Sequence, residues 1–68
     1  MNDRERIGNR IREIRMKKCL TAEQLAQLTG LKQQSISRIE MGKFSTGIDI
    51  LSKIADALDC TIDFIENQ

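Results

Sequence analysis

The sequence has no histidine and only two cysteines, which limits the chemistry that its side chains can perform. Cys19 and Cys60 lie far apart, without the Cys-x-x-Cys spacing of a zinc or redox site. No histidine is present to complete a metal site or to serve as a base beside a nucleophile. We therefore expect no metal, no cofactor and no enzymatic activity, and we expect both thiols to be reduced in a cytosolic protein.

Proline, tryptophan and tyrosine are also absent, and the hydrophobic residues never form a long run. A hydrophobic content of 40%, with few aromatic residues, suits an all-helical domain built on leucine, isoleucine and alanine. The apolar runs are too short to span a membrane, and the first ten residues, MNDRERIGNR, lack the apolar stretch of a signal peptide. We expect no membrane association and a cytoplasmic location.

A strong excess of positive charge is lacking too, because the formal net charge is only +1. The charges are nevertheless unevenly distributed along the chain. Residues 1–20 carry seven basic side chains against three acidic ones, and residues 46–68 carry one basic side chain against five acidic ones. If the basic segment lies beside a nucleic-acid-binding surface, the electric field of the protein would orient the whole molecule on a polyanion. The acidic segment would then be turned away from the polyanion. The alternative is that both segments are ordinary solvated helix faces.

Residues 21–41 predict two short helices joined by a glycine turn. Thr21 precedes a periodic apolar run that includes Leu25 and Ala26, and it is therefore expected to be an N-cap. Gly30 can adopt the positive φ that ends a helix, and Leu31 can fold back under the turn. The small side chain of Ala26 would let the second helix cross the first closely.

The second helix of this pair, at about residues 32–41, is expected to have one packed face and one free face. Helical spacing places Ile36, Ile39 and Glu40 on one side. The polar outer face would carry Gln33, Gln34, Ser37, Arg38 and Met41. A polar helix face of this composition is suited to lying against DNA.

This pattern resembles the Cro/C1-type (XRE-like) helix-turn-helix DNA-binding proteins of phage repressors and bacterial regulators. The resemblance extends from about Ile7 to Ile65 and includes the segments SISRIEMGK and ILSKIADALDCTIDFI. The helix-turn-helix positions of the family are occupied here by Leu25, Ala26, Gly30, Leu31, Ile36 and Ile39. The resemblance implies a single domain over residues 1–68, with an all-α fold: a compact five-helix bundle of the lambda-repressor-like type.

The remaining helices of this bundle can be placed from periodicity and capping residues. The first is expected from about Arg4 to Lys18, with Ile7, Ile11 and Ile14 facing the core. The fourth is expected to be capped by Ser45 or Thr46 and to reach about Leu58, and the fifth to be capped by Thr61.

Two turn positions depart from the family, which commonly has glycine where this chain has Cys19 and Asp59. Either Cys19 adopts a strained left-handed conformation or the turn differs locally. Aspartate is among the residues that tolerate such a turn best. Cys60 stands where the family usually has a buried valine, so we expect it to be a small buried hydrophobic residue.

The resemblance also implies the residues that contact DNA. Base reading is assigned to the outward residues of the second helix: Gln33, Gln34, Ser37 and Arg38. Phosphate binding is assigned to the backbone amides around Thr21 and Glu23 and to Lys43 and Ser45, while Lys32 could reach either a base or a phosphate. The family often has a glutamine that contacts the DNA backbone where this chain has Ala22, so one contact is missing.

Two further structural roles follow from the same resemblance. Arg15 and Glu40 occupy positions at which many family members form a partly buried ion pair, which would fix the angle of the recognition helix. In related repressors, the last helix and the loop before the fourth helix form the dimer contact. Three apolar residues of this chain are not needed by the core pattern and are the expected dimer residues: Phe64, Ile50 and Phe44.

The sequence thus predicts a sequence-specific, double-stranded DNA-binding regulator of transcription, most simply a repressor. A homodimer on an inverted repeat is expected, because one short helix touches only a few base pairs. The alternative is an antitoxin or protein-binding adaptor that keeps the domain for autoregulation while it binds a toxin-like partner.

Overall fold

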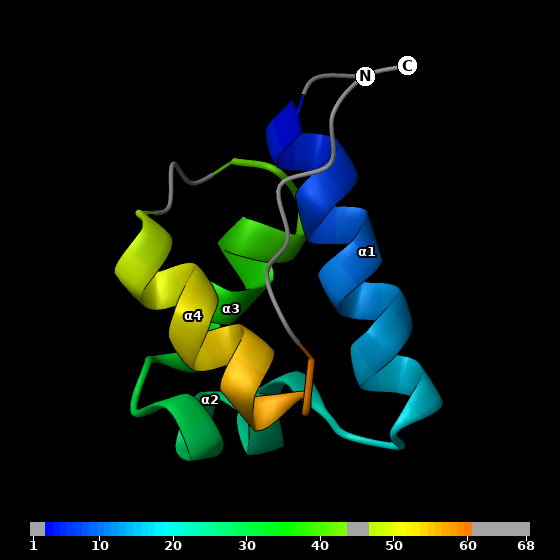
Figure 1. The fold of residues 1–68 in the computed structure, drawn as a ribbon, viewed down its shortest axis with the longest axis vertical. Coiled ribbons are helices and arrows are strands. Elements are labelled where there is room, and N and C mark those ends of the chain that lie inside the picture. Colours follow the sequence, from blue (N-terminus) through cyan, green and yellow to red (C-terminus); the bar gives the residue numbers. More distant parts are fainter. Residues whose placement is uncertain (1–2, 44–46, 61–68) are drawn as a thin grey trace.

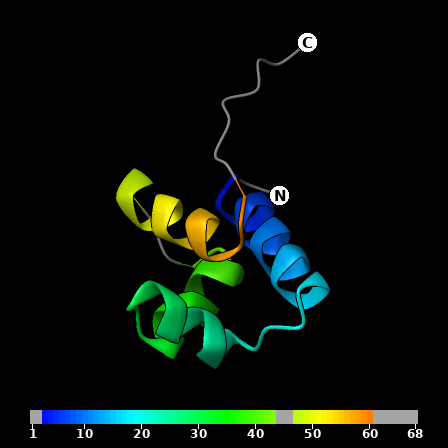
Figure 2. The same cartoon turned by 60° about the horizontal axis from the view of Figure 1, so that its bottom comes forward.

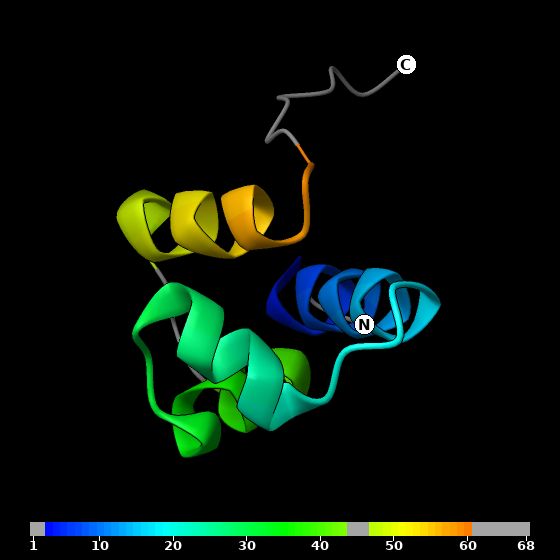
Figure 3. The same ribbon diagram turned by 90° about the horizontal axis from the view of Figure 1, so that it is seen from below.

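The computed structural model describes residues 3–43 and 47–60, and these residues form four α-helices (Figure 1). They are α1 (Asp3–Lys17), α2 (Ala22–Thr29), α3 (Gln33–Glu40) and α4 (Ile48–Ala57). Helix α3 packs against both α1 and α2, and α4 packs against α2. In Figures 2 and 3, α4 lies on one side of the bundle and the α2–α3 pair on the other, with α1 along one edge. The predicted all-α fold is therefore confirmed.

A core of aliphatic side chains holds these helices together. It draws residues from every helix and consists of Ile11, Leu25, Ala26, Ile36, Ile39, Ile54 and Leu58. The fully buried side chains are Leu25 on α2, Ile36 on α3, and Ile54 and Leu58 on and just after α4. Helices α2 and α3 also contact each other directly, which fixes their relative position.

The buried face of α1 differs from the expected isoleucine stripe. Ile11 is buried and Ile14 is half-buried, but Ile7 is 39% exposed. Gly8 takes the buried position one turn before Ile11, where α1 meets α3. The expectation that Ile7 belongs to the core is therefore wrong, because the buried stripe of α1 runs through Gly8.

Helix α4 begins one or two residues later than expected. Its N-cap is Gly47, in an extended conformation (φ −80°, ψ 169°), and no side chain of the described residues caps the helix. The prediction that Ser45 or Thr46 caps this helix is therefore wrong, since glycine itself serves as an N-cap. The predicted fifth helix, with its cap Thr61, lies outside the described residues.

Four turn residues have left-handed backbone conformations. Gly30 and Gly42 follow α2 and α3, with φ values of 72° and 73°. Cys19 and Asp59, which stand where the family has glycine, both have a φ of 57°. Of the two alternatives for Cys19, the structure shows the left-handed one. Cys60 is half-buried against the core rather than fully buried.

Over the described ranges, no helix is long and apolar enough to cross a membrane. The same part of the chain contains no cluster of three or more histidine, cysteine, aspartate or glutamate side chains that could hold a metal ion.

Candidate nucleic-acid interface

The N-terminus of α2 is closed by a reciprocal pair of hydrogen bonds. The backbone amide of Gln24 donates to the Thr21 hydroxyl at 3.0 Å, and the backbone amide of Thr21 donates to Oε1 of Gln24 at 2.8 Å. Thr21 is therefore the N-cap, as predicted, and Gln24 completes a capping box. Sequence reasoning missed Gln24, although the spacing Thr-x-x-Gln is the signal for this motif. The amides of Ala22 and Glu23 have no acceptor in the described part of the chain.

The turn between α2 and α3 combines a left-handed glycine with a buried hydroxyl group. The amides of Gly30 and Leu31 both donate to the carbonyl oxygen of Ala26, which ends α2. Thr29 is only 8% exposed. Its hydroxyl donates to the carbonyl oxygens of Leu25 and Ala26 at 2.9 and 3.1 Å. Thr29 was not identified from the sequence, because a threonine near the end of a helix has no distinctive signature. These bonds fix the direction in which the chain enters α3.

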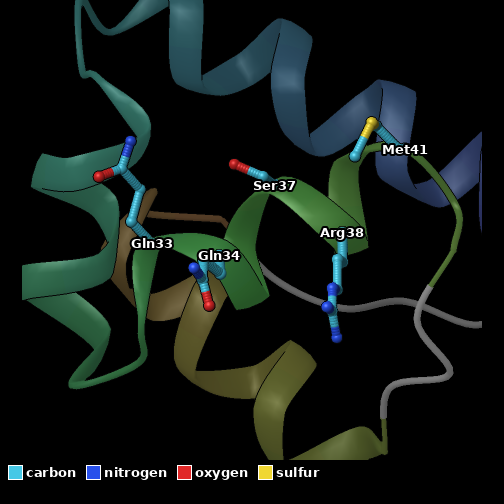
Figure 4. Close-up of a pocket in the computed structure, with 5 residues that line it drawn as sticks. All are labelled: Gln33, Gln34, Ser37, Arg38 and Met41. Carbon is cyan, nitrogen blue, oxygen red and sulfur yellow. The ribbon is translucent and has the colours of Figure 1, made fainter.

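Helix α3 separates its packed and free faces as the sequence predicts. Ile36, Ile39 and Glu40 are buried. One open depression of the surface is lined by the opposite face: Gln33, Gln34, Ser37, Arg38 and Met41. Figure 4 shows Ser37 and Met41 on the side nearer α1, and Gln34 and Arg38 on the other side. Within the described ranges, the side chains of Gln33, Gln34 and Arg38 have no hydrogen-bond partner and are exposed.

An ion pair between Arg15 and Glu40 ties α1 to the end of α3. Nε of Arg15 donates to Oε2 of Glu40 at 2.7 Å, and Nη2 donates to Oε1 at 3.0 Å. The two side chains are only 12% and 8% exposed, so water screens this bidentate pair weakly. The hydrogen bond with Glu40 raises the pKa of Arg15 above its ordinary value, against the opposing effect of burial.

Arg15 also contacts the chain that leads into α2. Its Nη1 donates to the carbonyl oxygen of Leu20 at 2.8 Å. One guanidinium therefore joins α1, the linker before α2 and the last residue of α3. Sequence reasoning missed Leu20, because a backbone acceptor leaves no mark on the choice of side chain.

The expected phosphate-binding residues are distributed around α3. Lys32 and Lys43 are exposed, one before the helix and one shortly after it. Lys32 is the N-cap of α3 but makes no capping bond with its side chain. Thr21 and Glu23 are exposed at the start of α2, and Ser45 lies outside the described residues.

The expected dimer residues are largely beyond what the structure describes. Phe44 and Phe64 lie outside the described residues. Ile50 is half-buried and packs against the core. The premise that the core does not need Ile50 is therefore wrong, because α4 turns this side chain inward.

The exposed charges of α4 and of α1 differ in sign. Asp49, Asp56 and Asp59 are exposed, on α4 and in the turn after it. On α1, Arg6 and Arg10 pair with neighbouring carboxylates in exposed positions. Arg12, Lys17 and Lys18 are exposed and form no ion pair in the described part of the chain. Figures 2 and 3 show α4 on the other side of the bundle from α3.

Comparison with known proteins identifies the family to which this architecture belongs. A family model described as Helix-turn-helix (HTH_3) matches residues 11–65. The chain belongs to this helix-turn-helix family, and the resemblance to Cro/C1-type regulators is confirmed. It is also 35% identical, over 54 residues, to an uncharacterized HTH-type transcriptional regulator of Archaeoglobus fulgidus. That match covers 79% of this chain and 77% of its relative.

Solved structures of transcriptional regulators share the fold. The restriction-modification controller protein C.AhdI of Aeromonas hydrophila superimposes with a TM-score of 0.85 and 36% identity, covering 87% of this chain and 89% of that one. The clp gene regulator ClgR of Corynebacterium glutamicum gives a TM-score of 0.85 and 25% identity, covering 87% and 76% of the two chains. These relatives are regulators rather than enzymes.

The ion pair leads to a prediction about stability. Glu40→Ala is expected to lower the free energy of unfolding by about 3 kcal/mol or more, because it leaves the guanidinium of Arg15 largely buried without its partner. The matched control is Glu13→Ala, which breaks the exposed pair with Arg10 and should cost less than about 1 kcal/mol. Urea denaturation of both variants measures the difference. Equal, small effects would show that the Arg15–Glu40 pair does not hold α3 in place.

Proposed function

We propose that this chain is a sequence-specific transcriptional regulator that places α3 in the major groove of double-stranded DNA. The observation that carries the proposal is the division of α3 into two faces. Its inner face and its last residue are buried against α1 and α2, while Gln33, Gln34 and Arg38 are exposed and have no hydrogen-bond partner among the described residues. The major groove is wide enough to admit such a helix. The simplest mode of action is repression by occupation of promoter DNA.

The chemistry of the free side chains suits base reading. A glutamine amide can pair with N6 and N7 of adenine, so Gln33 and Gln34 are the adenine-reading candidates. The guanidinium of Arg38 can bind O6 and N7 of guanine. Ser37 is half-buried beside them and would make a shorter contact. Each well-formed bidentate contact would discriminate against a wrong base by about 1–3 kcal/mol.

Phosphate contacts would fix the protein on the duplex on either side of the base-reading residues. At the start of α2, beside the capping residue Thr21, the amides of Ala22 and Glu23 have no acceptor among residues 3–43 and 47–60, and helix N-termini attract anions. Lys32 and Lys43 are exposed before and after α3. Ser45 remains a candidate on sequence grounds. Such contacts position the protein but carry no sequence information themselves.

The short length of α3 is the argument for a dimer. Eight residues span about 12 Å at 1.5 Å per residue, which corresponds to only a few base pairs. Two copies related by a two-fold axis would read an inverted repeat and double the number of contacts. Phe64 and Phe44 are the candidate dimer residues. Ile50 is a weaker one, because it already packs against the core.

Selection of bound fragments from a random duplex pool at near-physiological salt tests this function directly. We expect enrichment of an inverted repeat whose half-sites are about one helical turn apart, because two recognition helices would enter successive major grooves. Sequencing of the retained fragments measures both specificity and symmetry. A pool without an enriched motif would contradict the proposal and favour the protein-binding adaptor instead.

Substitutions in the two classes of contact should have different effects on binding. Arg38→Ala is expected to weaken binding to the selected duplex by about 1–3 kcal/mol and to relax the preference at one base position. Lys43→Ala should instead weaken binding to all duplexes similarly. It should also reduce the slope of log K against log salt concentration by about one. Fluorescence anisotropy at several salt concentrations distinguishes these outcomes. If Arg38→Ala weakens a shuffled duplex as much as the selected one, Arg38 is not a base-reading residue.

A further inference from the structure

Gly8 lies where α1 comes closest to the backbone of α3. It is buried, and a Cβ atom at this position would overlap the carbonyl oxygen of Ile39. The same atom would lie 2.7 Å from the carbonyl oxygen of Glu40 and 2.9 Å from its carbonyl carbon. These neighbours are backbone atoms, so they cannot move aside as the end of a flexible side chain would. Alanine at residue 8 would require α1 and α3 to separate.

The helix propensity of glycine does not account for its presence here. Glycine in a helix interior is less favourable than alanine, because it loses more conformational freedom on folding. Gly8→Ala would therefore stabilise α1 if the new methyl group met open space. The contact with Ile39 and Glu40 reverses this expectation.

Gly8 and Arg15 hold the same end of α3 from two places on α1. Gly8 lies against the backbone carbonyl of Glu40, and Arg15 binds its carboxylate. The two positions on α1 are seven residues apart, which is about 10 Å along the helix axis. Contact at two places restrains the angle between α1 and α3 more than contact at one place would.

A third close approach lies just after α3. A Cβ atom on Gly42 would lie 2.8 Å from Cα of Glu5 and 2.9 Å from its backbone nitrogen. The first turn of α1 therefore also lies against the turn that follows α3. At Gly42 the nearest atom is Cγ of the Glu5 side chain, at 2.6 Å, whereas at Gly8 all three nearest atoms are backbone atoms.

We propose that Gly8 is a positioning residue for DNA reading, because its missing side chain sets the depth and angle at which α3 is held by α1. This inference rests on the proposed DNA-reading role of α3. Ser37 and Arg38 are the base-reading candidates nearest to Ile39 and Glu40 in sequence, and a shift at that end of α3 moves them first. The first turn of α2 keeps its shape through its own capping box, Thr21 and Gln24, to which no residue of α3 contributes. Displacement of α3 would therefore move the base-reading residues relative to the phosphate-binding amides at the start of α2.

The test compares Gly8→Ala with Gly47→Ala as a matched control. A Cβ atom on Gly47 meets no atom within 4 Å, and its φ of −80° is available to alanine. Both variants are also made in an Asp59→Gly background, which relieves a left-handed residue away from α3 and so supports folding. Circular dichroism melts fix a temperature at which each protein is fully folded. Binding is then measured there against the selected duplex and a shuffled duplex of equal length.

We expect Gly8→Ala to bind the selected duplex at least tenfold more weakly than the wild type, the loss that corresponds to one base contact. Binding to the shuffled duplex should change by less than about threefold, since phosphate contacts tolerate a small shift. Gly47→Ala should match the wild type on both duplexes.

Three results would overturn the assignment of Gly8, and they are distinguishable from one another. Equal loss on both duplexes, or none on either, would show that Gly8 does not set the reading geometry. Failure of Gly8→Ala to fold in both backgrounds would show that it is needed for the fold itself. A wild-type protein that does not prefer the selected duplex would refute the proposed function, and this inference with it.

Discussion

The contact between α1 and the C-terminal end of α3 holds the outer face of α3 in position. Glu40 is held there through its carboxylate by Arg15 and through its backbone by the close approach of Gly8. The same guanidinium binds the carbonyl oxygen of Leu20, just before α2 begins. A change in the position of Arg15 would therefore reach both the end of α3 and the linker before α2. The two elements expected to contact DNA, α3 and the first turn of α2, are linked in this way through a single side chain.

Packing of the inner face leaves the outer face of α3 available. Leu25 and Ile36 are fully buried between α2 and α3, and the turn that joins these helices is fixed by Gly30 and Thr29. The polar residues of α3 are thus held on a rigid support rather than on a loop. Such preorganisation reduces the entropy lost on binding, which is a general requirement for precise recognition. Helix α4, which carries the exposed Asp49 and Asp56, lies on the other side of the bundle from α3 in Figures 2 and 3, so its charges would oppose a polyanion on α3 only weakly.

Short sequence patterns correctly predicted the features that depend only on residues close together in the chain. The N-cap at Thr21, the turn at Gly30 and the two faces of α3 follow from spacing and residue type. Helical periodicity gives the direction of a face but not the shape of its partner, so it placed Ile7 in the core and left Ile50 outside it. The role of Gly8 depends on backbone atoms more than thirty residues away, and a helical glycine alone suggests only lower stability. The candidate contacts to DNA follow from the family resemblance and the free face, while the structure supplies the restraint that orients them.

In the proposed complex, the restrained helix α3 presents its outer face to DNA. Backbone amide chemical shifts of isotope-labelled protein, followed during titration with the selected duplex, would show which helices contact the DNA. We expect the largest changes along α3 and at Ala22 and Glu23 in the first turn of α2, with α4 nearly unchanged. The largest changes on α4, with α3 unaffected, would contradict the account and place the binding surface on the opposite side of the bundle.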